Sequence, residues 1–198
     1  MHRSVSAIAL AGLVAGLTLL GACASQVERP IYPELRFSQL PVIELDVSRV
    51  EYVDRYNAPG APPYVEHLFP QTPETMAQNW ALQRFQAVGV TRSARVILTD
   101  ARVTSEALAT TMGIEGWFTV DQEEELDARA AVTVEIFDDL GGREGYVKAE
   151  ARLSRTLPEN LTLNERDAIA YEMTEQLIMA LDAEVEKAIR THLARYVH

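Results

Sequence analysis

The sequence has one cysteine, few basic side chains and no basic run, and each of these shortages excludes a class of protein. Cys23 is the only cysteine among 198 residues, so an intramolecular disulfide framework and a multi-cysteine zinc or iron–sulfur site are both excluded. The 18 Lys and Arg residues are outnumbered by 29 Asp and Glu residues. Because nucleic acids are bound by clustered cations, this composition argues against nucleic acid as the main partner.

Signatures of catalysis and metal binding are also missing. The chain has no Gly-x-Ser-x-Gly elbow, and His67, His192 and His198 do not have the spacing of metal ligands or of a catalytic triad. The acidic run at residues 121–125 lacks the alternating ligands and the central glycine of a calcium loop. We therefore expect a protein that is not an enzyme and that has no metal or other cofactor.

The first 22 residues have the pattern of an export signal. Arg3 supplies a short positive start, and residues 5–20 contain no charged side chain. Gly12 and Gly16 interrupt this apolar stretch, and no basic cluster follows it. These features favour a cleaved signal peptide over a permanent membrane-spanning helix.

The signal ends in Leu20-Gly21-Ala22-Cys23, which resembles the lipobox of bacterial lipoproteins. The resemblance implies a diacylglyceryl group on the Cys23 sulfur, cleavage after Ala22 and acylation of the new amino terminus. Ala24, and not Asp, follows the cysteine. In the enterobacterial sorting rule this favours the periplasmic face of the outer membrane. The membrane is thus an expected partner, reached through lipid at Cys23.

The rest of the chain is predicted to form a tether and one domain. Residues 23–41 are polar, proline-containing and without a period, which indicates an extended tether, and residues 42–198 are expected to form a single α+β domain. Residues 42–53 alternate as a strand does, with a change of phase near Ser48 and Arg49 that predicts a bulge.

Two helices are predicted. Thr72 as a cap and Pro73 at the first helical position indicate a helix that runs to Val88. Its expected buried side chains are Met76, Trp80, Leu82, Phe85 and Val88. A long helix is predicted over residues 163–197, with apolar side chains every four residues. Such a stripe turns by about 40° per step, so the last turns are expected to bend away or project from the domain.

Three further strands complete the predicted fold. They cover residues 95–103, 126–137 and 146–156, and a glycine-rich hairpin joins the last two. The expected fold class is α+β, a β-α-β-β-β-α sandwich with a four-stranded, mainly antiparallel sheet and two helices packed on one face. This order, together with the lipobox, resembles small envelope lipoproteins of the lipopolysaccharide-assembly and ABC-transport auxiliary types, at the level of topology alone.

Two apolar loop segments are candidate partner-binding surfaces. In residues 107–118 large apolar groups lie between glycines without a helix or strand period, and a similar group occurs near residue 68. The alternative is that these side chains form a small satellite core under the sheet edge. The candidate residues are Met112, Ile114, Trp117, Phe118, Leu68 and Phe69.

These observations leave three functional hypotheses. The first is a lipid-anchored, non-enzymatic accessory or docking subunit with an envelope protein partner, and the resemblance places it in lipid or lipopolysaccharide transport or assembly. The second is a periplasmic carrier that binds an apolar ligand between helix and sheet. The third is a periplasmic enzyme that uses carboxylates such as Asp100, Asp121 or Glu135. The sequence does not indicate the oligomeric state.

Overall fold

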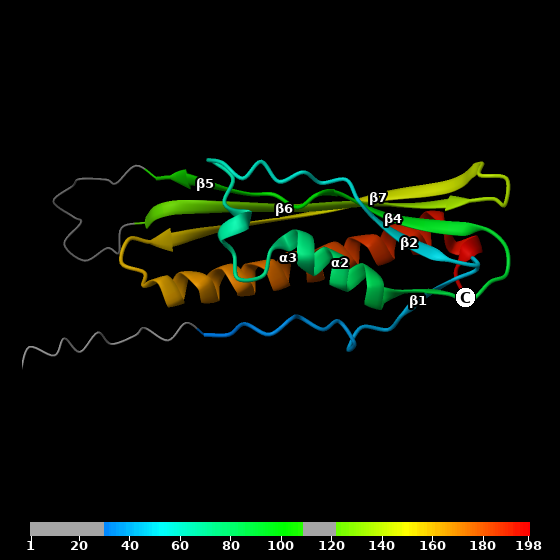
Figure 1. Cartoon of the computed structure of the whole chain (residues 1–198), viewed down its shortest axis with the longest axis horizontal. Coiled ribbons are helices and arrows are strands. Elements are labelled where there is room, and N and C mark those ends of the chain that lie inside the picture. Colours follow the sequence, from blue (N-terminus) through cyan, green and yellow to red (C-terminus); the bar gives the residue numbers. More distant parts are fainter. Residues whose placement is uncertain (1–29, 109–121) are drawn as a thin grey trace, which may run out of the picture. The chain divides into compact units, whose positions relative to one another are not determined.

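The computed structural model describes residues 30–108 and 122–198, and its larger compact unit runs from Ile31 to His198. A sheet forms one layer of this unit, and the two long helices lie together on one side of it (Figure 1). The elements in chain order are β1 (Ile43–Leu45), β2 (Val50–Asp54), η1 (Glu66–Leu68), α2 (Pro73–Arg84), β3 (Phe85–Ala87), β4 (Ser93–Asp100), β5 (Val103–Ala107), β6 (Gln122–Phe137), β7 (Arg143–Pro158), α3 (Leu163–His192) and η3 (Ala194–Tyr196).

The main sheet is built around β6. The antiparallel strand β7 pairs along one edge of β6, while β4 and β5 follow one another along the other edge, and β2 pairs with β4 in parallel. Because β4 and β5 share one edge of β6, the five strands make a sheet that is four strands wide. The predicted strand 95–103 is divided because the register with β6 shifts between Leu98 and Asp100. The predicted α+β sandwich with two helices on one face is confirmed.

The bulge predicted near Ser48 is instead a passage between two sheets. β1 pairs in parallel with β3 in a separate two-stranded sheet, whereas β2 belongs to the main sheet. Ser48 turns the chain there, since its amide donates to the carbonyl of Thr91 at 2.9 Å and its hydroxyl donates to the carbonyl of Arg92 at 2.6 Å. The change of phase in the apolar alternation near Ser48 therefore corresponds to the point at which the chain passes from one sheet to the other.

Helix α2 begins as predicted and ends earlier. The side chain of Thr72 accepts from the amide of Thr75. The helix stops at Arg84, because residues 85–87 extend to pair with β1. Of the five side chains expected to be buried, Met76, Trp80 and Phe85 are buried, whereas Leu82 and Val88 are 65% and 41% exposed.

Helix α3 carries a capping box at Thr162 and Glu165 and ends at His192. The helix ends before the predicted residue 197, and the chain bends into η3 after His192, which is the first of the two expected alternatives. The last residues do not project, because Leu193 and Tyr196 are buried. The amide of Asp46 donates to the carbonyl of Tyr196 at 2.8 Å and thereby fastens the end of the chain beside β1.

The core lies between the sheet and the helices. Alternate side chains of β6 face it and are buried, as predicted: Leu126, Ala128, Ala130, Val132, Val134 and Ile136. From α3, the apolar side chains of Met173, Leu177, Ile178 and Leu181 fill the same layer and are 0% exposed. These side chains occupy the space in which the carrier hypothesis placed a ligand.

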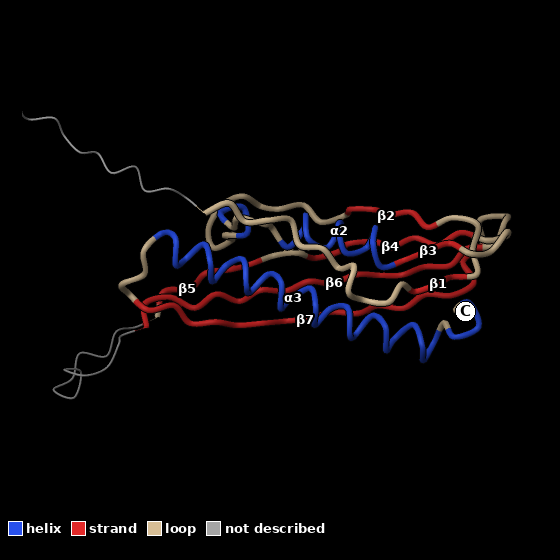
Figure 2. The backbone as a smooth tube through the Cα atoms, turned by 90° about the horizontal axis from the view of Figure 1, so that it is seen from below, coloured by secondary structure: helices blue, strands red, loops and turns tan. Residues whose placement is uncertain are grey.

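Residues 31–41, expected as tether, have neither helix nor strand but lie along the outer side of the helices (Figures 1 and 2). Phe37 is buried, and its amide donates to the side chain of Gln83 in α2 at 2.9 Å. The ring centres of Tyr32 and Tyr171 are 5.1 Å apart. The compact unit therefore includes this segment. Among the described residues, no helix is both long enough and apolar enough to span a membrane.

One buried ion pair joins the two helices. The Nε atom of Arg84 in α2 lies 2.7 Å from the carboxylate of Asp182 in α3, and their side chains are 1% and 7% exposed. The indole N–H of Trp80 donates to the same carboxylate oxygen at 2.8 Å. A second carboxylate, that of Glu186, contacts the Arg84 guanidinium at 2.5 Å and also accepts from Arg190. Every group in this cluster therefore has a partner, as burial of charge requires.

We predict that Asp182→Ala lowers the free energy of unfolding by about 3 kcal/mol or more, because it leaves the buried guanidinium of Arg84 without its main partner. Chemical denaturation measures the change. Glu184→Ala, which removes an exposed pair with Lys187 on the same helix, is the matched control and should cost less than about 0.5 kcal/mol. Equal effects of the two substitutions would contradict the assigned role of the pair.

Candidate functional site

The face of the sheet opposite the two long helices is partly exposed, since Thr99 and Lys148 are exposed whereas Ile97 and Thr133 are 2% and 8% exposed. Side chains that alternate with the core positions point to this face, and a row of them crosses the sheet from Ile97 in β4 through Thr133 in β6 to Lys148 in β7. Two shallow hollows of about 360 and 310 Å³ lie next to one another here and share Thr99, Thr133 and Lys148 in their lining. We call this surface the open-face groove.

Four cations and two carboxylates line the open-face groove. Glu150 pairs with Arg129 at 2.5 Å, and Glu135 pairs with Arg143 at 2.7 Å. The other two cations, Arg55 and Lys148, have no ion-pair partner among the described residues. The groove thus has an excess of positive charge in a chain whose net charge is −11.

The carboxylate of Glu150 is held in its charged form. The hydrogen bond from Arg129 lowers the pKa of Glu150, and the charges of Arg129 and Arg152 act in the same direction. The groove therefore keeps a fixed pattern of alternating charge on β6 and β7 at neutral pH. Such a surface suits a partner that presents complementary charges.

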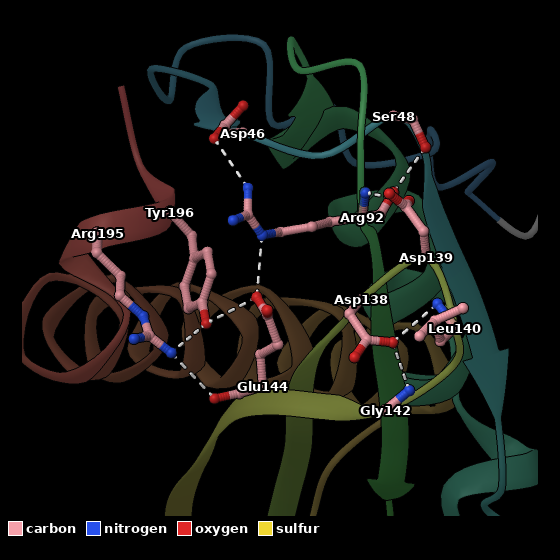
Figure 3. A network of polar contacts seen from close by, with 10 residues as sticks. All are labelled: Asp46, Ser48, Arg92, Asp138, Asp139, Leu140, Gly142, Glu144, Arg195 and Tyr196. Atoms are coloured by element: carbon pink, nitrogen blue, oxygen red, sulfur yellow. Dashed lines mark hydrogen bonds and ion pairs between the residues drawn. The ribbon is translucent and has the colours of Figure 1, made fainter.

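A second polar cluster lies at the end of the sheet and is centred on Arg92 (Figure 3). The guanidinium donates to Glu144 in β7 at 2.9 Å and lies 3.3 Å from the carboxylate of Asp46, which follows β1. It also lies over the ring of Tyr196, 5.6 Å from the ring centre, and the Tyr196 hydroxyl donates to Glu144 at 3.2 Å. Arg92 thus joins the turn after β1, the β3–β4 connection, β7 and η3.

The backbone at Arg92 has a φ of 65°, which is unusual for a residue other than glycine. The carboxylate of Asp139 accepts from the Arg92 amide at 2.8 Å, and the Ser48 hydroxyl donates to the carbonyl of Arg92. The segment after β1 leaves no room for a side chain at Gly89, because a Cβ atom there would lie 2.7 Å from the amide nitrogen of Val47. Packing therefore fixes this corner, and the cluster serves to fasten the chain end.

An acidic cluster surrounds the start of α2. Glu66 is 2% exposed, and its carboxylate accepts from the hydroxyl of Tyr56 at 2.8 Å and from the amide of Val103 at 3.3 Å. Burial, and next the charge of Asp54, raise the pKa of Glu74 in the first turn of the helix. Within residues 30–108 and 122–198, no group of three or more acidic, His or Cys side chains has the arrangement of a metal site.

The structure describes two of the seven residues selected from the sequence. Leu68 is 66% exposed, whereas Phe69 is 9% exposed and belongs to the core. Cys23, Met112, Ile114, Trp117 and Phe118 lie outside the described residues.

The structure describes two of the three carboxylates proposed for an enzyme, and each of the two pairs with an arginine. Asp100 pairs with Arg102 at 2.9 Å, and Glu135 pairs with Arg143 on the open face. The third, Asp121, lies outside the described residues. Sequence reasoning did not select Lys148 or Arg55, although the polar alternation of the predicted strand 146–156 places Lys148 on the solvent side.

Comparisons with known proteins do not assign a family. No family profile and no curated protein matches the chain. Among solved structures, rare lipoprotein B from Shewanella oneidensis has a TM-score of 0.37 and 11% identity, covering 73% of this chain and 96% of its own. A minor lipoprotein from Acinetobacter baumannii has a TM-score of 0.36 and 12% identity, covering 73% and 94%. Likenesses this distant carry no argument about function.

We predict that Glu74→Gln raises the melting temperature at pH 7. The pKa of Glu74 is raised above 4.5 in the folded state, so folding stability falls as the pH rises through that range and Glu74 becomes charged. The uncharged Gln avoids this cost at pH 7 and brings little change at pH 3.5. Thermal melts at the two pH values measure the difference.

Glu184→Gln on the exposed side of α3 is the control for this comparison. A melting temperature of Glu74→Gln that is unchanged or lower at pH 7 would contradict the assigned environment of Glu74.

Proposed function

We propose that the protein is a lipid-anchored envelope lipoprotein that acts as a non-enzymatic accessory or docking subunit. Its anchor is lipid on Cys23, its place is the periplasmic face of the outer membrane, and its docking surface is the open-face groove. The machine that it serves handles lipid or lipopolysaccharide transport or assembly, as the topology and the lipobox together suggest.

The observation that carries this proposal is the motif Leu20-Gly21-Ala22-Cys23 at the end of an uncharged apolar stretch. The only cysteine of the chain stands at the position that a lipoprotein signal requires. One acyl chain binds a membrane marginally, whereas two or more hold a protein there stably. A triacylated Cys23 therefore needs no further membrane-binding surface on the domain.

The docked segment 31–41 makes the free tether short. Ile31 begins the compact unit, and eight residue steps separate it from Cys23, which reach at most about 28 Å when fully extended. Tyr32 donates to the carbonyl of Asn164 at 3.3 Å, so the tether leaves the domain beside the start of α3. We infer that this end of the domain stays close to the bilayer.

The same end of the sheet carries the apolar candidate segment. Residues 108–121 connect β5 to β6, and Ala107 of β5 is in register with Glu124, which in turn is in register with Leu157 just before α3. Met112, Ile114, Trp117 and Phe118 belong to this connection, and they remain our candidates for a second contact with the partner.

The charge distribution favours a protein partner for the open-face groove. A net charge of −11 discourages broad adsorption to anionic headgroups, while the local excess of cations at Arg55 and Lys148 favours a partner with a complementary acidic surface. The pairing of Asp100 and Glu135 with arginines supports a binding role over a catalytic one.

Mass spectrometry and membrane fractionation of the native protein beside Cys23→Ala test the anchor. The native protein should begin at an acylated Cys23 and fractionate with the outer membrane, whereas the variant should remain uncleaved or be mislocalised. Ser25→Ala, two residues beyond the cysteine, is the matched control and should behave as the native chain. An unmodified Cys23 thiol in the membrane fraction would overturn the proposal.

A further inference from the structure

The last strand of the sheet presents a long edge without a backbone partner. β7 has 16 residues and pairs with β6 on one side, and no strand of the described chain pairs with its other side. The opposite edge of the sheet is β2, which has five residues. A long unpaired edge exposes a row of N–H and C=O groups to which another strand can add.

The side chains of β7 match a second copy of β7 in the antiparallel direction. In a pair related by a twofold axis through the sheet, one residue stands opposite itself and the others pair symmetrically around it. With Ala149 at the axis, Lys148 of each copy lies opposite Glu150 of the other, and residues 143–155 of both strands are paired. The same register sets Arg143 opposite Arg155, and each of these arginines already has a carboxylate partner in its own chain, Glu135 and Glu172 respectively. Registers centred on Lys148 or Glu150 would place like charges opposite one another, which is destabilising.

This register gives partners to groups that the single chain leaves exposed. Lys148 has no ion-pair partner among the described residues, and here it gains one in each copy. Tyr146, which is 51% exposed, comes to lie opposite Arg152, whose side chain is 61% exposed. A register centred on Ala151 would instead place Lys148 opposite Ser154 and leave it without a carboxylate.

Helix α3 does not follow the β7 edge along its whole length (Figure 2). The N-terminal half of the helix lies over the sheet, whereas its C-terminal half lies beyond the β7 edge (Figure 2). On the helix side, the residue at the axis is the small, partly buried Ala149. A second β7 would run beneath the overhanging half of α3, and by symmetry the second α3 would cover the first strand in the same way.

We propose that two copies of this protein associate through their β7 edges and form one continuous sheet, with Ala149 on the twofold axis. The contact takes Lys148 from the open-face groove but leaves Arg55 and Thr99 of the groove accessible to a further partner, and it does not depend on the lipid anchor.

Co-capture from cells tests the contact. Full-length protein carrying two different epitope tags is co-expressed, extracted in mild detergent and captured through one tag, and the second tag is quantified. The native pair should be co-captured, whereas Lys148→Glu in both copies, which sets two glutamates opposite one another at each crossing, should reduce recovery about tenfold. Arg49→Glu in both copies makes a comparable charge change at an exposed position just before β2, at the opposite edge of the sheet, and should leave recovery unchanged.

The decisive co-capture experiment co-expresses two different variants. Glu150→Lys in both copies should also reduce recovery, but one copy with Lys148→Glu and one with Glu150→Lys should recover the native level, because each face then pairs opposite charges again. Lack of native co-capture, loss with Arg49→Glu, or failure of the mixed pair to recover would each overturn the proposal. Thermal melts of each variant separate loss of contact from loss of folding.

Discussion

The arrangement of the domain depends on one buried interaction, the pairing of Arg84 in α2 with Asp182 in α3. Two charges taken out of water are tolerated only when both are paired, and Trp80 and Glu186 complete that requirement. The pair holds both helices side by side on one face of the sheet. The two long helices therefore do not cover the other face, and no described strand pairs with the outer edge of β7.

The parts of the fold that follow from local chemistry could be predicted from the sequence. The alternation along β6 and the Thr72-Pro73 helix start both act within a few residues, and both were found as expected. The parts of the fold that depend on pairing between segments far apart in the sequence could not be predicted from it. α2 ends at Arg84 because the next residues pair with β1, and the phase change at Ser48 reflects contacts with a segment more than 40 residues away.

The candidate site was predictable to a smaller extent. Apolar character selected Phe69, but apolar residues also build cores, and Phe69 is buried there beside an exposed Leu68. Lys148 was visible as a solvent-facing residue on a predicted strand. Its lack of a partner depends on which arginines the sheet places next to Glu150 and Glu135, and strand register supplies that information only in the folded state.

Because both helices pack on one face of the sheet, we propose that the partner protein binds to the open face. Site-directed photo-crosslinking in intact cells tests it most directly, with a photoreactive residue placed in turn at the exposed positions Thr99 and Arg143 in the open-face groove and at Gln176 and Glu184 on the exposed side of α3. The account predicts a discrete adduct with another envelope protein from both groove positions and none from the helix positions. Adducts from α3 alone would contradict it.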